Sequence, residues 1–200
     1  LRHLALRFGV SRIDAVLYTH SHADHIHGID ELRSYNTIQK TEIQCYGSAG
    51  TISYLHQAFP YIFAPGDNGA NYIPRLKSRV IEGPFTLFGR EIIPLPASHG
   101  PGGPVFGYRV GSFAYLTDVA SVPDETLGLM EGLDTLILDA LRPTYHPSHL
   151  TIETATGLAL RIGAGRTYFT HMSHDVDYEV TNAAPPPGIE LAYDGLELEF

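Results

Sequence analysis

The sequence predicts an α/β (α+β) fold arranged as a four-layer αββα sandwich. Two observations lead to this prediction. Short apolar runs of β-rich composition alternate with segments of helical pattern, and a first half of strands and helices is followed by a similar second half. The 200 residues suit one domain over residues 1–200, and 20 glycines with 14 prolines predict many turns.

In the first half, an apolar run predicts a buried strand over 14–18, and a second strand is expected over 42–46. Helices are expected over 24–34 and from 49 to near 59. Residues 64–74 contain proline, glycine, aspartate and asparagine, so this stretch is expected to be a loop.

In the second half, successive β-rich runs predict strands over 85–88, 91–95, 105–110, 112–116, 135–138 and 166–169. A final hairpin is expected from 189–192 and 196–200, with Asp194 and Gly195 at its turn.

Two helices are expected between these strands. One spans 123–131 with Ser121 as its cap, and the other spans 152–162 with Thr151 as its cap. A hydroxyl side chain at this position accepts a hydrogen bond from the first turn of a helix.

The densest group of potential metal ligands lies directly after the first strand, in the segment His-Ser-His-Ala-Asp-His at 20–25. His20 and His22 are two apart on an extended segment, so they point to the same side and can reach one ion. Asp24 and His25 follow where the chain turns into a helix, and they are expected to reach a second ion. A histidine-rich surface loop is the alternative interpretation.

Three further candidates, His99, Asp118 and His171, each stand at the end of a β-rich run. An isolated histidine such as His99 is more often structural. Its position after a strand favours a ligand, because α/β folds present their site residues at strand ends.

The 20–25 segment resembles the HxHxDH signature of the metallo-β-lactamase fold, and His99, Asp118 and His171 follow in the order of that superfamily. The resemblance covers nearly the whole chain and implies a metal-dependent hydrolase of this fold. Members of the superfamily have further strands before the position of Leu1, so N-terminal strands are expected to be missing here.

The resemblance also assigns the candidate ligands to two divalent ions. The implied ligands are His20, His22 and His99 for one ion and Asp24, His25 and His171 for the other, with Asp118 bridging both. Nitrogen and oxygen ligands without a thiolate suit Zn²⁺ or Mn²⁺.

Further strings resemble one branch of this superfamily, which contains the phosphoribosyl 1,2-cyclic phosphate phosphodiesterase of the carbon–phosphorus lyase pathway. They are DVA at 118–120, LDALR at 138–142, HLTIE at 149–153, THMSH at 170–174 and YDG at 193–195. The branch implies cleavage of small cyclic phosphodiesters, phosphoribosyl cyclic phosphate or 2′,3′-cyclic nucleotides, by a metal-bridged hydroxide. That enzyme has a cysteine-rich structural zinc site, whereas this chain has only Cys45. The resemblance therefore does not identify the substrate of this chain.

The catalytic candidates are Asp118, His149 and His174. The resemblance makes His149 the general acid, and a helix-entry histidine without chemistry is the alternative. His174 is expected to orient a ligand or contact the substrate, or else to lie on the surface. Arg142 and His146 share a loop with His149, and all three are expected to contact the substrate.

Two other features have more than one interpretation. Asp139 ends a strand and is expected to support a metal-bound histidine or to act as a turn residue. The aromatic segment 59–63 is expected to cover a sugar or base, to pack in the core, or to form a patch in a homodimer.

Other functions stay open beside the phosphodiesterase. A thioester hydrolase and a tRNA-processing nuclease share the metal motif, but neither an added helical domain nor a basic arm is evident. A non-catalytic module that binds a nucleotide or a metal is the third alternative, and His149 argues against it.

The net charge of −9 and a pI near 5.6 argue against long nucleic acid as a partner, but not against a small phosphate ester or nucleotide. No apolar run is long enough to span a bilayer, so no membrane partner is expected. A single cysteine suits a cytoplasmic protein.

Overall fold

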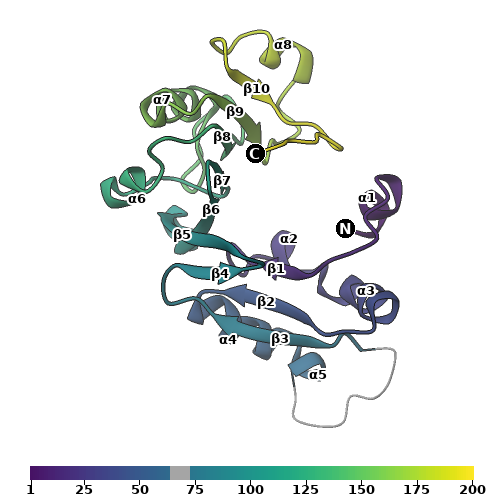
Figure 1. Ribbon diagram of the computed structural model, residues 1–200. Coiled ribbons are helices and arrows are strands. Elements are labelled where there is room, and N and C mark those ends of the chain that lie inside the picture. The colour runs from purple at the N-terminus through teal and green to yellow at the C-terminus, as the bar shows by residue number, and fades with distance from the viewer. Residues whose placement is uncertain (64–72) are drawn as a thin grey trace. The chain divides into compact units, whose positions relative to one another are not determined.

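The computed structural model describes residues 1–63 and 73–200, which form two compact units (Figure 1). The first unit spans Leu1–Glu82 and the second unit spans Gly83–Phe200. Each unit has its own sheet and its own hydrophobic core, because strands and helices must bury their apolar faces against one another. The predicted α/β class is confirmed.

The first unit is built on a parallel sheet in the order β1-β2-β3. The strands are β1 (Ala15–Leu17), β2 (Ile43–Gly47) and β3 (Leu76–Val80). The helices are α1 (Arg2–Arg7), α2 (Ala23–Ile26), η1 (Ile29–Glu31), α3 (Leu32–Gln39), α4 (Ala49–Ala58) and α5 (Pro60–Phe63). Ile43 and Cys45 on β2 are fully buried in the core of this unit, so β2 fixes the centre of the sheet.

The second unit contains a seven-stranded sheet in the order β10-β9-β8-β7-β6-β5-β4. The strands are β4 (Phe85–Leu87), β5 (Arg90–Ser98), β6 (Pro104–Val110), β7 (Phe113–Leu116), β8 (Thr135–Asp139), β9 (Arg166–Thr170) and β10 (Ile189–Leu191). Strands β4 to β7 pair antiparallel and β7 to β10 pair parallel. The carboxyl ends of the parallel strands therefore meet at one edge of the sheet.

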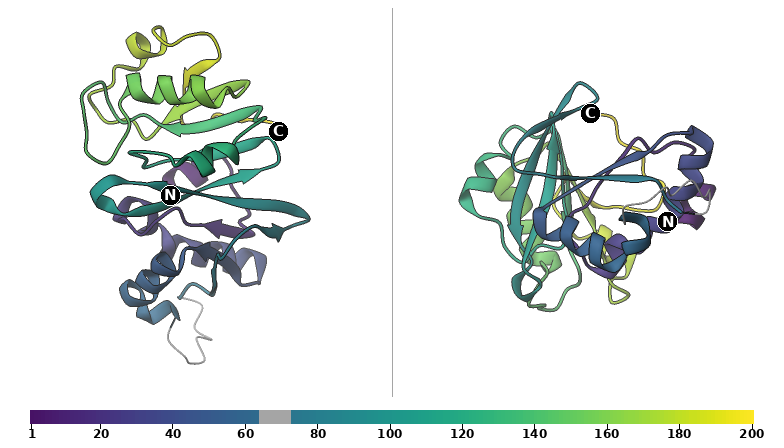
Figure 2. Two further views of the ribbon diagram at one scale, coloured as in Figure 1. Left: turned by 90° about the vertical axis from the view of Figure 1, so that its left-hand side faces the viewer. Right: turned by 90° about the horizontal axis from the view of Figure 1, so that it is seen from below.

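The helices of the second unit are η2 (Gly100–Gly102), α6 (Asp124–Gly128), α7 (Ile152–Ile162) and α8 (Tyr178–Asn182). Figure 2 shows α6 and α7 on the same face of the large sheet. The hydroxyl of Thr151 accepts a hydrogen bond from the backbone N–H of Thr154, and the Thr154 hydroxyl bonds back in a capping box. This confirms Thr151 as the predicted cap.

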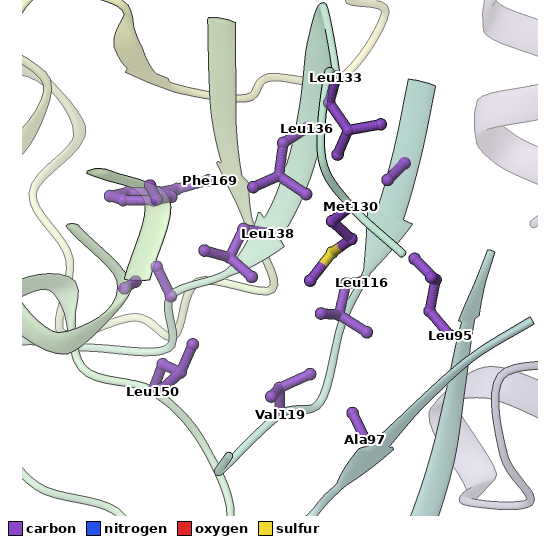
Figure 3. Packing of buried hydrophobic residues seen from close by; sticks show 14 of the residues in the cluster. Leu95, Ala97, Leu116, Val119, Met130, Leu133, Leu136, Leu138, Leu150 and Phe169 are labelled. Atoms are coloured by element: carbon purple, nitrogen blue, oxygen red, sulfur yellow. The ribbon is translucent and has the colours of Figure 1, made fainter. Parts of the chain in front are cut away.

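The core of the second unit lies under its central strands. Leu95, Leu116 and Leu138 come from three different strands and are fully buried with Met130 and Phe169 (Figure 3). Strand β8 is buried at every position. This packing fixes the strands whose ends carry the candidate site residues.

Several predicted elements differ from the structure. The helix predicted over 24–34 is divided into α2, η1 and α3, because the chain turns at Gly28, which favours helix weakly. Ser121 is not the cap of α6: its backbone bonds to Ser98, and Pro123 precedes the helix without a side-chain bond.

The predicted final hairpin is also wrong. Strand β10 pairs in parallel with β9, and residues 196–200 form no strand. Phe200 instead stacks on Phe113, with ring centroids 4.3 Å apart. Five elements of the described structure were not predicted: α1, α5, β3, η2 and α8. Of the loop predicted over 64–74, residues 64–72 lie outside the described part of the chain.

Within the described part of the chain, no helix combines the length and the apolar composition that crossing a membrane requires.

Candidate active site

The histidine cluster of the first unit forms where β1 passes into α2. Tyr18 and Thr19 continue the chain in buried positions after β1, and His20 is only 4% exposed. His22 is the N-cap of α2 and still has extended backbone angles, φ −66° and ψ 153°. His20 and His22 therefore leave an extended segment before the helix begins, as the two-residue spacing predicted.

The imidazole rings of this cluster converge. The ring centroid of His20 lies 4.5 Å from that of His22 and 4.3 Å from that of His25. The Thr19 hydroxyl lies 3.1 Å from Nδ1 of His20 and 3.4 Å from Nδ1 of His25. Since Thr19 faces both Nδ1 atoms, Nε2 is the atom with which each ring would hold an ion. Nε2 of His25 lies 3.3 Å from the Asp24 carboxylate.

The site residues of the second unit stand at successive strand ends. His99 follows β5, Asp118 follows β7, Asp139 is the last residue of β8, and His171 follows β9. Asp118 and His171 have left-handed backbone angles, with φ of 60° and 61°. Residues other than glycine rarely adopt this backbone conformation, and those that do are concentrated at functional sites.

Two buried carboxylates organise this edge of the sheet. Asp118 accepts a hydrogen bond from Thr117 at 2.9 Å, and its other oxygen lies 3.4 Å from Nε2 of His171. Asp139 is fully buried, and one of its oxygens accepts the backbone N–H of Leu150 at 3.1 Å. Burial of both carboxylates is tolerated because each has hydrogen-bond donors beside it.

His149 lies between these two carboxylates. Its Nδ1 is 3.3 Å from Asp139 Oδ1, and its Nε2 is 4.0 Å from Asp118 Oδ1. Its ring is stacked on that of His171, with centroids 5.0 Å apart and planes at 13°. The side chain is 10% exposed, so His149 is a part of this group and not a surface histidine at a helix entry.

His99 is oriented by the loop that carries His149. Its Nδ1 donates to the backbone carbonyl of Ser148 at 2.7 Å, which leaves Nε2 as the potential ligand atom. A Cβ placed on Gly102 would overlap the His99 ring. The turn after β5 therefore needs glycine at this position.

His146 and Arg142 lie in the same loop as His149. The His146 ring centroid is 5.0 Å from that of His149. Burial, followed by the positive charges of His149 and Arg142, lowers the pKa of His146 below its ordinary value. Arg142 directs its guanidinium toward carbonyl groups of its own loop.

His174 is not brought together with these residues. Its side chain is 95% exposed, and its Nε2 faces Asp175 at 3.5 Å. The surface alternative describes its position, and we leave it out of the proposed machinery.

Sequence reasoning missed some supporting groups. Thr19 and Thr117 each precede a candidate ligand and place a hydroxyl beside it. A threonine before a ligand at a strand end is a signal that could have identified both. No sequence signal could have identified the Ser148 carbonyl, because every residue has a backbone carbonyl and the sequence does not show which one contacts His99.

The donor set fits a divalent metal. Within the second unit, His99, Asp118 and His149 each offer a ligand atom within 4.8 Å of the others, and Asp139, His149 and His171 do the same. Imidazole nitrogen and carboxylate oxygen are donors that suit Zn²⁺ and Mn²⁺. The first unit adds three imidazoles and a carboxylate of the same kind.

Comparison with known families decides the relationship. The family model described as the beta-lactamase superfamily domain matches residues 2–172. The chain belongs to the β-lactamase superfamily. This superfamily member has the metallo-β-lactamase fold of metal-dependent hydrolases, as the HxHxDH resemblance implied.

Two of the solved structures that are similar to this superfamily member bear on its fold and function. A new diphosphatase from the PhnP family shares 42% sequence identity with a TM-score of 0.89, and the match covers 100% of this chain and 76% of that chain. Zn²⁺-bound PqqB from Methylobacterium extorquens shares 17% identity with a TM-score of 0.71, over 94% of this chain and 73% of that chain. The second similarity shows the fold alone.

A curated relative, named octanoyltransferase, comes from Porphyromonas gingivalis. It is 31% identical over 198 residues, which are 98% of this chain and 40% of that protein. Because this chain spans only 40% of that relative's length, the transferase name stays with that protein.

Proposed function

We propose that the protein is a dinuclear metal-dependent phosphodiesterase that hydrolyses small phosphodiesters, including cyclic ones. The observation that carries the proposal is the position of His149, buried between the Asp118 and Asp139 carboxylates at the edge of the sheet. A site that only bound metal would not need a titratable histidine held in this way.

We propose His20, His22 and His99 as ligands for one ion and Asp24, His25 and His171 for the other, with Asp118 shared, as the superfamily resemblance implies. The imidazole and carboxylate donors suit Zn²⁺ or Mn²⁺. When bound, such ions supply Lewis acidity and make hydroxide available near neutral pH.

His149 is proposed to hold and deliver the proton that the leaving oxygen needs. Its Nδ1 donates to Asp139, so the ring is oriented. Nε2 then carries the proton that can pass to a ribose oxygen, which is a poor leaving group unless it is protonated. His146 is proposed to contact the substrate from the same loop.

A second candidate substrate is a diphosphate, which the 42% identical diphosphatase favours. Water would again attack phosphorus, but the group that leaves would be a phosphate. A phosphate leaves readily without a proton, so His149 would matter less for this reaction. The dependence on His149 therefore separates the two substrates.

The test is turnover of a substrate panel by protein loaded with Zn²⁺ or Mn²⁺. The panel contains phosphoribosyl cyclic phosphate, 2′,3′-cyclic nucleotides, bis(p-nitrophenyl) phosphate and a nucleoside diphosphate, with a thioester, a precursor tRNA and a β-lactam as controls. Metal-dependent phosphodiester cleavage that Asp118→Ala abolishes supports the proposal. Turnover of the thioester or the tRNA alone, or no turnover by metal-loaded protein, contradicts it.

A small phosphate ester or nucleotide is the partner that this function requires. Four expectations stay predictions. The protein is expected to bind neither long nucleic acid nor a membrane, to form a homodimer and to be cytoplasmic.

A further inference from the structure

The 142–148 loop connects the end of β8 to the start of α7 and carries part of the proposed machinery. The loop is closed at its base by backbone hydrogen bonds. The Leu141 N–H donates to the Leu150 carbonyl at 3.0 Å, and the Ile152 N–H donates to the Arg142 carbonyl at 3.1 Å. The two ends of the loop are therefore held together, and its interior must be held by other contacts.

Arg142 supplies contacts inside the loop. Its Nε donates to the Thr144 carbonyl at 3.4 Å, and Nη2 donates to the Tyr145 carbonyl at 3.1 Å. The rigid fork of a guanidinium can bond two neighbouring acceptors at once. A lysine in its place has one ammonium group and cannot reproduce this pair of contacts.

The outer side of the guanidinium faces a second segment. Nη1 of Arg142 lies 4.0 Å from Asp175 Oδ2. That segment is joined to the base of the loop, because the Ser173 N–H donates to the Leu141 carbonyl at 2.8 Å. The Asp175 N–H in turn donates to the Ser173 hydroxyl at 3.3 Å. Arg142 thus links the loop to the segment after His171.

The far end of the loop, at Ser148, forms hydrogen bonds with two histidines. The Ser148 N–H donates to Nδ1 of His146 at 3.3 Å, and the Ser148 carbonyl accepts from Nδ1 of His99 at 2.7 Å. His149 is the next residue, and its ring centroid lies 4.7 Å from that of His99. A shift of this backbone would therefore move a proposed metal ligand and the proposed acid together.

We propose that Arg142 is a positioning residue that braces the 142–148 loop, and that it does not act as a direct phosphate ligand. The kinetic part of this inference rests on the proposed function, whereas the brace itself does not. Loss of the brace lowers kcat, because misplacement by about 1 Å reduces a rate by about 10²-fold. KM changes little, since no substrate contact is removed.

The first measurement is hydrogen–deuterium exchange in peptides that cover residues 141–152. Arg142→Met is expected to speed exchange of the amides inside the loop about tenfold by local opening, including the Ser148 amide, which donates to His146. Arg161→Met is the matched control, because Arg161 also meets an aspartate, Asp124 at 2.8 Å, on an exposed surface. Unchanged exchange in Arg142→Met overturns the brace, whether or not the protein hydrolyses any phosphodiester.

The second measurement separates kcat from KM on two substrates of different charge, bis(p-nitrophenyl) phosphate and phosphoribosyl cyclic phosphate. A brace predicts that Arg142→Met lowers kcat about equally for both and that Arg142→Lys fails to restore it. A phosphate ligand predicts a raised KM, largest for the more highly charged substrate, that Arg142→Lys restores. That second pattern overturns the inference. If neither substrate is turned over by the wild-type protein, the proposed function fails and the exchange measurement still decides on the brace.

Discussion

The two units supply their site residues in different ways. The first unit provides His20, His22, Asp24 and His25 from one strand-to-helix junction, and Thr19 beside them orients two of the rings. The second unit provides its residues singly from the ends of strands far apart in the sequence. The first set depends on local backbone conformation, and the second depends on the register of a whole sheet.

This difference determines how many other site residues are disturbed when one site residue is substituted. In the first unit, a change in one ligand leaves a junction whose conformation is set by its neighbours in the chain. In the second unit, Asp118 and Asp139 each lie within 4.0 Å of the same two histidines, His149 and His171. We therefore expect changes in the second unit to cost more activity than matched changes in the first.

The largest effect is expected for Asp118→Ala. The carboxylate is 2% exposed and is proposed to be shared by both ions. Loss of several kcal/mol of charge stabilisation, at ~1.4 kcal/mol per tenfold change in rate, lowers kcat/KM by about 10³-fold or more. Steady-state kinetics together with metal analysis by mass spectrometry checks this expectation.

Asp24→Ala is the matched change in the first unit. The Asp24 side chain is 65% exposed, so its replacement leaves no buried charge unsatisfied. We expect a smaller loss of activity than for Asp118→Ala. An equal or greater loss in Asp24→Ala would remove the proposed difference between the units.

The next effect concerns His149→Ala. Removal of a general acid costs about 10²–10⁴-fold in rate when the leaving group needs a proton. We expect that loss for a 2′,3′-cyclic nucleotide, and a much smaller loss for bis(p-nitrophenyl) phosphate, whose leaving phenolate is stable. Metal content should stay at the wild-type level. Equal losses on both substrates would show that His149 acts through the metals or the fold and not as the acid.

A smaller effect is expected for Gly102→Ala, which tests how strictly the second unit holds His99. The added Cβ would overlap the His99 ring, so the ring must shift. Disturbed ligand orientation typically costs about 10–100-fold in metal affinity or activity. Competition with a chromophoric chelator measures the affinity.

Gly157→Ala is the control for this substitution. A Cβ on Gly157, in the middle of α7, meets no atom within 4 Å. Alanine is favoured over glycine inside a helix by roughly 0.5–1 kcal/mol, so this variant should be slightly more stable with unchanged metal affinity. Normal metal affinity in Gly102→Ala would mean that the His99 turn relaxes freely.

The same difference explains how much the sequence could predict. The cluster at 20–25 was predicted correctly as a strand-to-helix junction, since its spacing and its conformation are both local. Strand β3 was not predicted because the segment is mostly exposed and contains the charged residues Lys77 and Arg79. Its pairing with β2 makes it a strand. Such pairing is a tertiary effect that overrides local propensity.

The second unit was less predictable for the same reason. The order of His99, Asp118 and His171 was recognised through the superfamily resemblance, not through spacing. The backbone of Ser148, which orients His99, leaves no trace in the sequence. The predicted final hairpin failed because Ile189–Leu191 found a parallel partner in β9, which no local turn signal indicates.

The smallest effect concerns Cys45, which reports on the first unit alone because it is the only cysteine in the chain. Burial raises the pKa of its thiol to about 12, and a hydrogen bond from Tyr18 opposes this in part. An unfolded thiol has a pKa of about 8.5, so above that pH the unfolded state releases a proton that the folded state keeps. The free energy of unfolding should therefore fall by up to ~1.4 kcal/mol per pH unit between about pH 9 and the folded pKa.

Urea unfolding at pH 8 and pH 10 measures this decrease, and Cys45→Ala should reduce it by the contribution of the thiol. Native protein at pH 9 should also react with a thiol reagent far more slowly than protein in urea, because Cys45 is fully buried. Rapid labelling of the native protein, with activity retained, would show that the first unit opens independently of the second. In that case the junction at 20–25 would be the less stable half of the proposed metal centre, and bound metal should slow the labelling, because a ligand that binds only the folded unit stabilises it.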